Sequence, residues 1–409
     1  MKRKFRGNLV GFVTLLAFFI VGTSSFGKAQ KIVIWHAENE DFMKTELEKF
    51  AKSSGIDLVV ERQVVSKFKG ILVTAVNKGA GPDIALVPAD FVGLKDQLQL
   101  SVIPKADIAA DSVIQNSWYN TTTLQDKNVY GHPITGGNHL MLYYNKKFVK
   151  KAPEKWSDFY KPETWQKERP KNVIGWNYNE MYWFAPFVGA FGSWPITDYK
   201  ITLNDKGMAE ALEFYKAQAD NGLISEDCNY DCNSVNFFKG DYAFAINGDW
   251  AYKETKEALK ENFGVAKIPS IKGKTVTPMF SSKALIFPRK SLDSDKKASL
   301  KKLVAHMQGV VFQTALATKL NNLPVQKAAM DKFHSVADDN MKALLSQLDV
   351  AKPMPSIPEM VATWEGMRKG FNAYKKGKID SAKAAKLMQK SATKLHKRSE
   401  KKSSTAGSK

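Results

Sequence analysis

The sequence has few cysteines and few histidines, which narrows the metal and redox chemistry that it can support. Cys228 and Cys232 are its only two cysteines, and six histidines are spread over 409 residues. A structural zinc ion takes about four ligands, and no histidine lies near the cysteine pair. We therefore expect no metal site there. Two alternatives stay open: a local disulfide in an oxidising compartment, or an unbridged structural pair.

The sequence also lacks the short motifs that carry the commonest hydrolytic and nucleotide chemistry. It contains no His-Glu-x-x-His pair, no phosphate-binding loop and no recognisable Ser/His/Asp arrangement. No internal repeat is present. We therefore expect neither a cofactor nor one of these catalytic centres.

Beyond residue 22 the sequence has no apolar run of the roughly 20 residues that span a bilayer. Residues 9–22 form an apolar run of 14 residues, with four cationic residues before it and small residues at 25–27. This pattern predicts that 1–27 are a cleaved signal peptide and that the mature chain is exported, by preference to a bacterial periplasm. An uncleaved anchor is the alternative. No cysteine in or just after the run offers a thiol to a lipid.

The net charge of +20 is concentrated at the two ends of the chain. Residues 375–409 carry 12 Lys and Arg against Asp380 and Glu400, and the first residues contribute four more positive charges. The remaining body is nearly balanced, so the sequence does not predict a basic groove for nucleic acid. The basic end could contact an anionic membrane or cell-wall polymer, or form a solvated face.

The first 60 residues after the apolar run alternate between strand and helix patterns. Residues 31–35, 56–60 and 83–87 are short β-rich runs, separated by helical periodicity around 42–51 and 66–78. This order predicts an α/β fold with an open, mostly parallel sheet. Ligands of such sheets bind beyond the carboxyl ends of the strands, which places 36–40 and 88–91 at a functional edge.

Five short motifs are spread over residues 31 to about 397. They are Ile32-Val33-Ile34-Trp35 before an acidic loop, Gly81-Pro82-Asp83-Ile84, Tyr144-Asn145-Lys146 with Trp156-Ser157-Asp158-Phe159, the segment 238–250 ending in Asn247-Gly248-Asp249-Trp250, and the segment 357–364 with Arg368. In kind and in order they resemble the motifs of bacterial extracellular solute-binding proteins of the maltose-binding type, the periplasmic components of ABC transporters.

The resemblance implies a two-lobed periplasmic-binding-protein fold, similar to type II. Each lobe would be an open sheet flanked by helices, and hinge strands would link the lobes. We expect residues 28–135 and 281–325 to form the N-terminal lobe, and 136–280 and 326–398 the C-terminal lobe. Residues 399–409, rich in Lys and Ser, are expected to be a disordered basic tail.

The resemblance also implies a set of ligand-binding positions. It implies stacking rings at Tyr182, Trp250 and Trp364, and polar contacts at Asn39, Glu40, Asp90, Asn138, Glu180 and Arg368. The rings match the maltose binders better than the polar positions do. Val87 stands where those proteins carry Trp, Phe91 where they carry Arg, and Asn138 where they carry Glu. Sugar is retained as the expected ligand class, but maltose itself is in doubt.

These residue types suit a sugar because a pyranose has an apolar face and a rim of hydroxyl groups. Aromatic rings cover the face, and carboxylates, Asn and Arg pair the hydroxyls, which are costly to bury unpaired. Each position also has an ordinary structural interpretation. The rings could be core residues and the charged groups plain surface residues, and Trp176 and Trp183 could belong to either group.

Three functions therefore remain in view from the sequence. The first is a monomeric receptor that captures an oligosaccharide, similar to maltose or maltodextrin, for an inner-membrane ABC permease. The second is a receptor for another polar solute, such as a sugar phosphate, polyol or polyamine. The third is a secreted glycosidase using Asp90 and Glu180, which would need two carboxyl groups set across a scissile bond.

Overall fold

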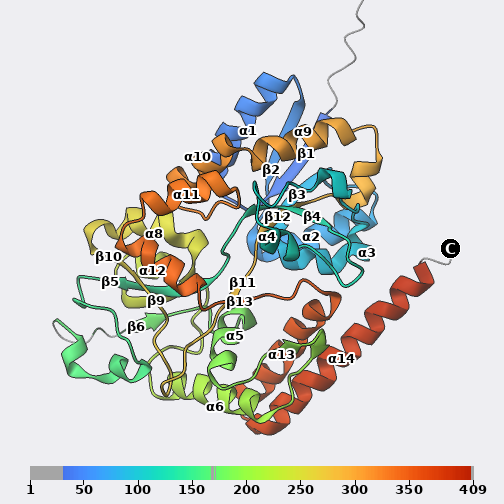
Figure 1. The fold of residues 1–409 in the computed structure, drawn as a ribbon. Helices are drawn as coiled ribbons and strands as arrows, with labels where there is room; N and C mark the ends of the chain where they lie inside the picture. Colours follow the sequence, from blue (N-terminus) through green and yellow to red (C-terminus); the bar gives the residue numbers. More distant parts are fainter. Residues whose placement is uncertain (1–30, 167–169, 171, 407–409) are drawn as a thin grey trace, which may run out of the picture.

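The computed structural model describes residues 31–166, 170 and 172–406 and contains two α/β lobes, each built on one mixed sheet (Figure 1). The expected signal peptide, 1–27, lies outside the described residues. Within the described ranges, no helix is both long enough and apolar enough to span a bilayer.

The first sheet has the strand order β2-β1-β3-β12-β4. The strand β1 pairs in parallel with β2 and β3, whereas β12 pairs antiparallel with β3 and β4. The expected strands near 31, 56 and 83 are confirmed to within two residues. The strand bounds are β1 (Lys31–His36), β2 (Asp57–Arg62), β3 (Ile84–Pro88), β4 (Gly131–Thr135) and β12 (Lys283–Ile286).

Apolar side chains on both faces of the first sheet explain why β3 is an unbroken apolar run. Ile84 and Leu86 enter one core cluster, and Ala85 and Val87 enter a second cluster on the other face. Such two-sided burial is typical of sheets covered by helices on both faces. The covering helices include α1 (Glu40–Ser54), α2 (Val65–Asn77), α9 (Lys297–Gln308) and α10 (Val310–Leu320).

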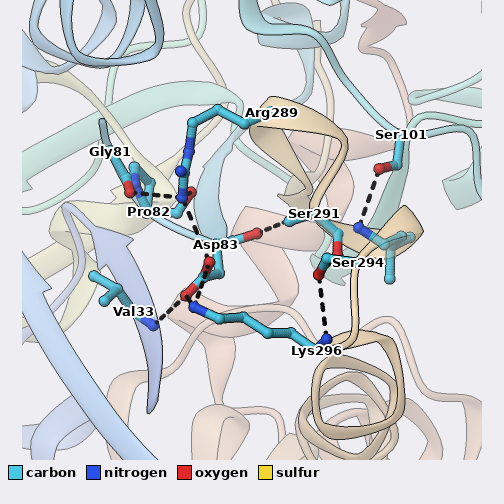
Figure 2. Close-up of polar contacts among 10 residues, drawn as sticks. Val33, Gly81, Pro82, Asp83, Ser101, Arg289, Ser291, Ser294 and Lys296 are labelled. Carbon is cyan, nitrogen blue, oxygen red and sulfur yellow. Dashed lines mark hydrogen bonds and ion pairs between the residues drawn. The ribbon is translucent and has the colours of Figure 1, made fainter. Parts of the chain in front are cut away.

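The motif Gly81-Pro82-Asp83 has a structural role at the start of β3 (Figure 2). The buried Asp83 carboxylate accepts a bond of 2.9 Å from the Val33 N–H of β1 and pairs at 2.9 Å with Lys296. Arg289 donates to the carbonyls of Gly81 and Pro82 and lies 3.4 Å from Asp83. The motif therefore joins the first strands to the segment that follows β12, about 200 residues later in the chain.

The second sheet has the strand order β10-β5-β9-β6 and is the base of the second lobe. The central strand β9 is buried along its whole length, pairing antiparallel with β5 and parallel with β6. The strand bounds are β5 (Leu140–Asn145), β6 (Asn172–Gly175), β9 (Tyr242–Gly248) and β10 (Phe263–Ala266). One large core cluster fills this lobe, and it includes Trp176, which is fully buried.

The chain passes between the sheets at two adjacent places. β4 of the first sheet ends at Thr135 and β5 of the second begins at Leu140, and the return runs from β11 (Met279–Phe280) into β12. Ser281 donates its N–H to the Gly137 carbonyl at 2.9 Å, so the two crossings are hydrogen-bonded to each other. A short parallel pair, β11 with β13 (Lys352–Pro353), lies beside them.

The helices of the second lobe lie between the strands of its sheet and after the return crossing. The principal ones are α5 (Met181–Ala190), α6 (Lys206–Asp220), α8 (Tyr252–Leu259), α11 (Lys327–Ser335), α12 (Asp339–Leu348), α13 (Pro358–Lys375) and α14 (Ser381–Ala406). Its shorter elements are α7 (Val235–Phe238), β7 (Ile196–Thr197) and β8 (Lys200–Ile201), and those of the first lobe are α3 (Lys95–Leu98) and α4 (Asn116–Asn120).

The helices α13 and α14 pack closely because glycines line their contact. A Cβ atom on Gly370 would lie 2.3 Å from the Met388 Cγ, and one on Gly366 would lie 2.6 Å from the Ala392 Cβ. Beyond this contact α14 continues to Ala406. The expected disorder of 399–409 stays a prediction, and 407–409 lie outside the described residues.

Candidate functional site

Three aromatic side chains from distant segments meet near the crossings. Tyr182 lies in α5, Trp250 follows β9 in a short 3₁₀ turn, and Trp364 lies in α13. The Tyr182 ring centroid lies 6.3 Å from that of Trp250 and 6.1 Å from that of Trp364. All three residues are half-buried. We call them the ring group, and it occupies the positions where the sequence resemblance implied stacking platforms.

A fourth ring, that of Tyr230, extends this group and was missed by the sequence reasoning. The Trp250 indole N–H donates to the Tyr230 hydroxyl at 3.0 Å. Tyr230 lies in the loop closed by a disulfide between Cys228 and Cys232, which is the first of the two alternatives that the sequence left open. Trp183 touches both rings, but it is buried and donates to the Ile246 carbonyl, so it serves packing.

The hydroxyl of Tyr182 holds the ring group against the crossings. It donates a short hydrogen bond to the Asn138 carbonyl, and it lies 3.4 Å from the Met279 carbonyl. Burial raises the pKa of Tyr182 well above its ordinary value, and the charges of Asp249 and Asp90 act in the same direction. The hydroxyl is therefore neutral and engaged with the backbone, so the ring face is what Tyr182 can offer a ligand.

The first lobe contributes Asp90, two residues after the end of β3, and the charge of Asp90 helps to raise the pKa of Tyr182. Asp90 lies in the 3₁₀ segment Ala89–Leu94, is buried, and pairs at 3.3 Å with Lys69 of α2. The Lys69 ammonium also lies 5.1 Å from the centroid of the Phe91 ring. Sequence reasoning missed Lys69, because helical periodicity places it in α2 without showing which side of the helix meets the other lobe.

Glu180, immediately before α5, belongs to the second lobe and is influenced by the first. It is exposed, yet the protein groups around it displace enough water to raise its pKa. Backbone N–H groups and the charges of Lys69 and Arg368 partly offset this effect. Lys69 therefore interacts with one carboxylate of each lobe. It forms an ion pair with Asp90, and its charge acts to lower the pKa of Glu180.

The start of α13 also rests on the first lobe. A Cβ atom on Gly93 would lie 2.9 Å from the Ile357 carbonyl oxygen, one residue before α13 begins. Because α13 carries Trp364, this close approach places a member of the ring group beside the Asp90 segment.

Asn138 lies within the first crossing, and its polar groups are used there. Its backbone has a positive φ of 47°, its side-chain amide donates to the Ser281 hydroxyl at 3.0 Å, and its N–H donates to Asp249 at 2.9 Å. These bonds join both crossings and the turn after β9. In this structure the Asn138 amide and N–H are therefore engaged with the protein's own crossing segments.

Asp249 is a buried carboxylate at the same crossing that the sequence reasoning did not single out. Burial raises its pKa to about 7, although Lys283 and two backbone N–H groups favour the charged form. Its Oδ2 lies 3.9 Å from the Nδ1 of His139, whose own pKa burial lowers to about 4. Gly137 is required beside it, since a Cβ there would lie 2.1 Å from Asp249.

The remaining expected residues make their contacts elsewhere. The Asn39 side chain caps α1 by accepting the Phe42 N–H at 3.0 Å, and the exposed Glu40 lies 4.0 Å from Arg62. Arg368 is exposed and pairs with Glu365 one turn away, while its charge reaches Glu180. In the part of the chain that the structure describes, no cluster of three or more His, Cys, Asp or Glu is arranged to hold a metal ion.

Comparison with known proteins places this geometry in a family. Residues 47–344 match the family model described as bacterial extracellular solute-binding protein. The maltodextrin-binding protein MdxE of Bacillus subtilis is 25% identical over 365 residues, covering 84% of each protein. A maltooligosaccharide ABC transporter solute-binding lipoprotein of Streptococcus pneumoniae is 26% identical over 328 residues, covering 75% of this chain and 74% of the relative.

Solved structures agree with this assignment. The maltose/maltodextrin-binding domain MalE of Bdellovibrio bacteriovorus, bound to maltotriose, superposes with a TM-score of 0.77 at 25% identity, covering 89% of this chain and 99% of that one. The maltose-maltodextrin binding protein of Alicyclobacillus acidocaldarius has a TM-score of 0.79 at 20% identity, with 89% and 100% covered, and supports the fold alone. The expected two-lobed α/β fold is confirmed. The chain belongs to the bacterial extracellular solute-binding proteins, and the relatives and solved structures named above are of the maltose/maltodextrin-binding type.

Proposed function

We propose that the protein is the periplasmic oligosaccharide receptor of an ABC import system and binds a maltodextrin-like sugar between its lobes. The observation that carries this proposal is the ring group. Tyr182, Trp250 and Trp364 come from three separate segments, and the Tyr182 ring centroid lies 6.3 Å from that of Trp250 and 6.1 Å from that of Trp364. The charge of Asp90 acts on Tyr182, and Glu180 immediately precedes the helix that carries Tyr182.

The chemistry of a sugar assigns different roles to the rings and to the polar groups of the site. Half-buried ring faces can cover the apolar face of a pyranose, and each well-packed ring contributes about 0.5–1.5 kcal/mol beyond the area it buries. Asp90 and Glu180 can accept hydroxyl bonds, and the Lys69 ammonium can donate one. Because these groups come from both lobes, a sugar that contacts all of them stabilises the arrangement in which the lobes approach each other.

We further propose that the crossings at 136–139 and 281–282, together with a third passage of the chain near 325–326, are the hinge. The third passage lies beside the first crossing, since the Gly136 N–H donates to the Leu323 carbonyl at 2.9 Å. In this division 28–135 and 281–325 form one lobe, and 136–280 and 326–398 form the other. The contacts of Asn138 with Ser281 and Asp249 would then maintain the crossing segments while the lobes move. An inner-membrane permease would accept the closed form, and no residue of this chain takes part in chemistry on the sugar.

The test is a ligand panel read by tryptophan fluorescence and melting temperature. Purified protein is mixed with maltotriose, longer maltodextrins, unrelated oligosaccharides, glycerol phosphate and a polyamine. We expect saturable binding of an oligosaccharide that is recovered uncleaved. Trp250→Ala and Trp364→Ala should each weaken it by about tenfold or more, since each removes about 1–3 kcal/mol of stacking and burial.

The control is Tyr199→Ala, which removes an exposed ring from the β7–β8 turn. This variant should bind as the unmodified protein does. If only glycerol phosphate or the polyamine binds tightly, that solute and not a sugar is the ligand of the receptor. Unchanged sugar affinity in both tryptophan variants would refute the ring group as the binding platform.

A further inference from the structure

The outer side of the α13–α14 pair carries a basic groove that the sugar site does not use. The groove has a volume of about 590 Å³. Its lining residues within the described part of the chain include five cations, Arg368, Lys369, Lys390, Lys394 and Arg398, and one carboxylate, Glu365. The others are Asn372, Leu387, Ser391 and Leu395. Five cationic side chains therefore face one anionic side chain.

Most of these cations have no carboxylate partner among the side chains that the structure describes. Arg368 pairs with Glu365. Lys369, Lys390, Lys394 and Arg398 are exposed, and among side chains that the structure describes no carboxylate lies within 4.0 Å of them. Unpaired cations that converge on a groove produce a positive potential that favours an anionic partner.

The groove also has an apolar component and a free helix end. Leu395 lies among the cations and is 39% exposed, and Leu387 is half-buried. The side chains of α14 that enter the core end at Ala392, and none of 393–398 is buried. Figure 1 shows the last turns of α14 extending away from the body of the molecule.

We propose that this groove, together with the free end of α14, is a docking surface for an anionic phospholipid bilayer. Lys390, Lys394 and Arg398 are spaced four residues apart, so they repeat about every 6 Å along one side of the helix. A row of this kind can meet several headgroup phosphates at once, and Leu395 can rest at the boundary with the acyl chains. Such docking would hold the receptor near a membrane-bound transporter, but it is independent of which solute the receptor carries.

The experiment is cosedimentation with vesicles at low salt. The protein is mixed with phosphatidylcholine vesicles containing or lacking phosphatidylglycerol. We expect binding only to the anionic vesicles, with loss at high salt because surface charges are screened. Replacing Lys390, Lys394 and Arg398 together by Glu should lower the partition coefficient at least about 100-fold, from roughly a factor of five for each cation near an anionic surface.

The matched control reverses three exposed lysines on the other lobe, Lys44 and Lys52 of α1 and Lys302 of α9. It changes the net charge equally and should keep vesicle binding. Both variants retain residues 399–409. We expect both to keep the sugar response and the melting temperature of the unmodified protein. Absence of vesicle binding, or equal losses in the two variants, would overturn the proposal, and neither result would affect the sugar-binding assay.

Discussion

The buried Asp249 at the crossing makes a quantitative pH prediction for the variant Asp249→Asn. The folded protein raises the pKa of this carboxyl from 3.8 to about 7, mainly through burial. In the unfolded chain the group loses its proton near its ordinary pKa. Between the two values the folded state therefore holds a proton that the unfolded state has released, and stability falls as the pH rises.

The magnitude follows from the two pKa values. Between pH 5 and pH 8 the contribution of Asp249 should reduce the free energy of unfolding by about 2–3 kcal/mol. The asparagine keeps an oxygen that can accept the Asn138 N–H, but it carries no charge to bury. The stability of Asp249→Asn relative to the unmodified protein should therefore rise by this amount over the interval.

Urea unfolding of both proteins, followed by circular dichroism at pH 5, 6, 7 and 8, measures this difference. Histidines that are buried in the neutral form, such as His139, affect both proteins and largely cancel. Stability curves that stay parallel across the four pH values would refute the buried, proton-holding state of Asp249.

Three further predictions concern the site and its support. Replacing Cys228 and Cys232 by Ser should release the loop that positions Tyr230 and break its hydrogen bond with Trp250, so sugar binding should weaken by about threefold to tenfold. Tyr230→Phe in the disulfide-bonded protein should show a similar loss. Full affinity in both variants would contradict the role of the loop. Lys69→Met should weaken sugar binding, because it removes a hydroxyl donor and leaves the buried Asp90 without its ion-pair partner. Lys67→Met, an exposed neighbour on α2, should bind normally in the same titration. Gly370→Ala should lower the free energy of unfolding by about 1–3 kcal/mol, because the added Cβ would overlap Met388. The control Gly70→Ala has open space around it in α2 and should be neutral or slightly stabilising. Equal effects of the two changes would argue against close α13–α14 packing.

The sequence predicted the parts of the fold that depend on local patterns. The first three strands and the helices between them have clear apolar periodicity, and they lie where that periodicity placed them. Pairings between distant segments left no local pattern. The antiparallel insertion of β12 between β3 and β4, and the parallel pair of β11 with β13, join segments more than 70 residues apart.

The candidate site divides in a similar way. The ring positions followed from the family motifs, and the structure brings Tyr182, Trp250 and Trp364 together. Lys69 and Asp249 were not foreseeable, because a lysine in an amphipathic helix and an aspartate in a turn are ordinary surface residues until the other lobe or the crossing covers them. The ring between the two cysteines was the one local signal that could have pointed to Tyr230.

A crystal structure of the protein with the tightest-binding oligosaccharide of the panel tests the central claim most directly. We predict sugar rings against the faces of Tyr182, Trp250 and Trp364, with hydroxyl groups within hydrogen-bond distance of Asp90 and Glu180. An oligosaccharide bound away from these three rings, or no oligosaccharide binding at all, would contradict the account.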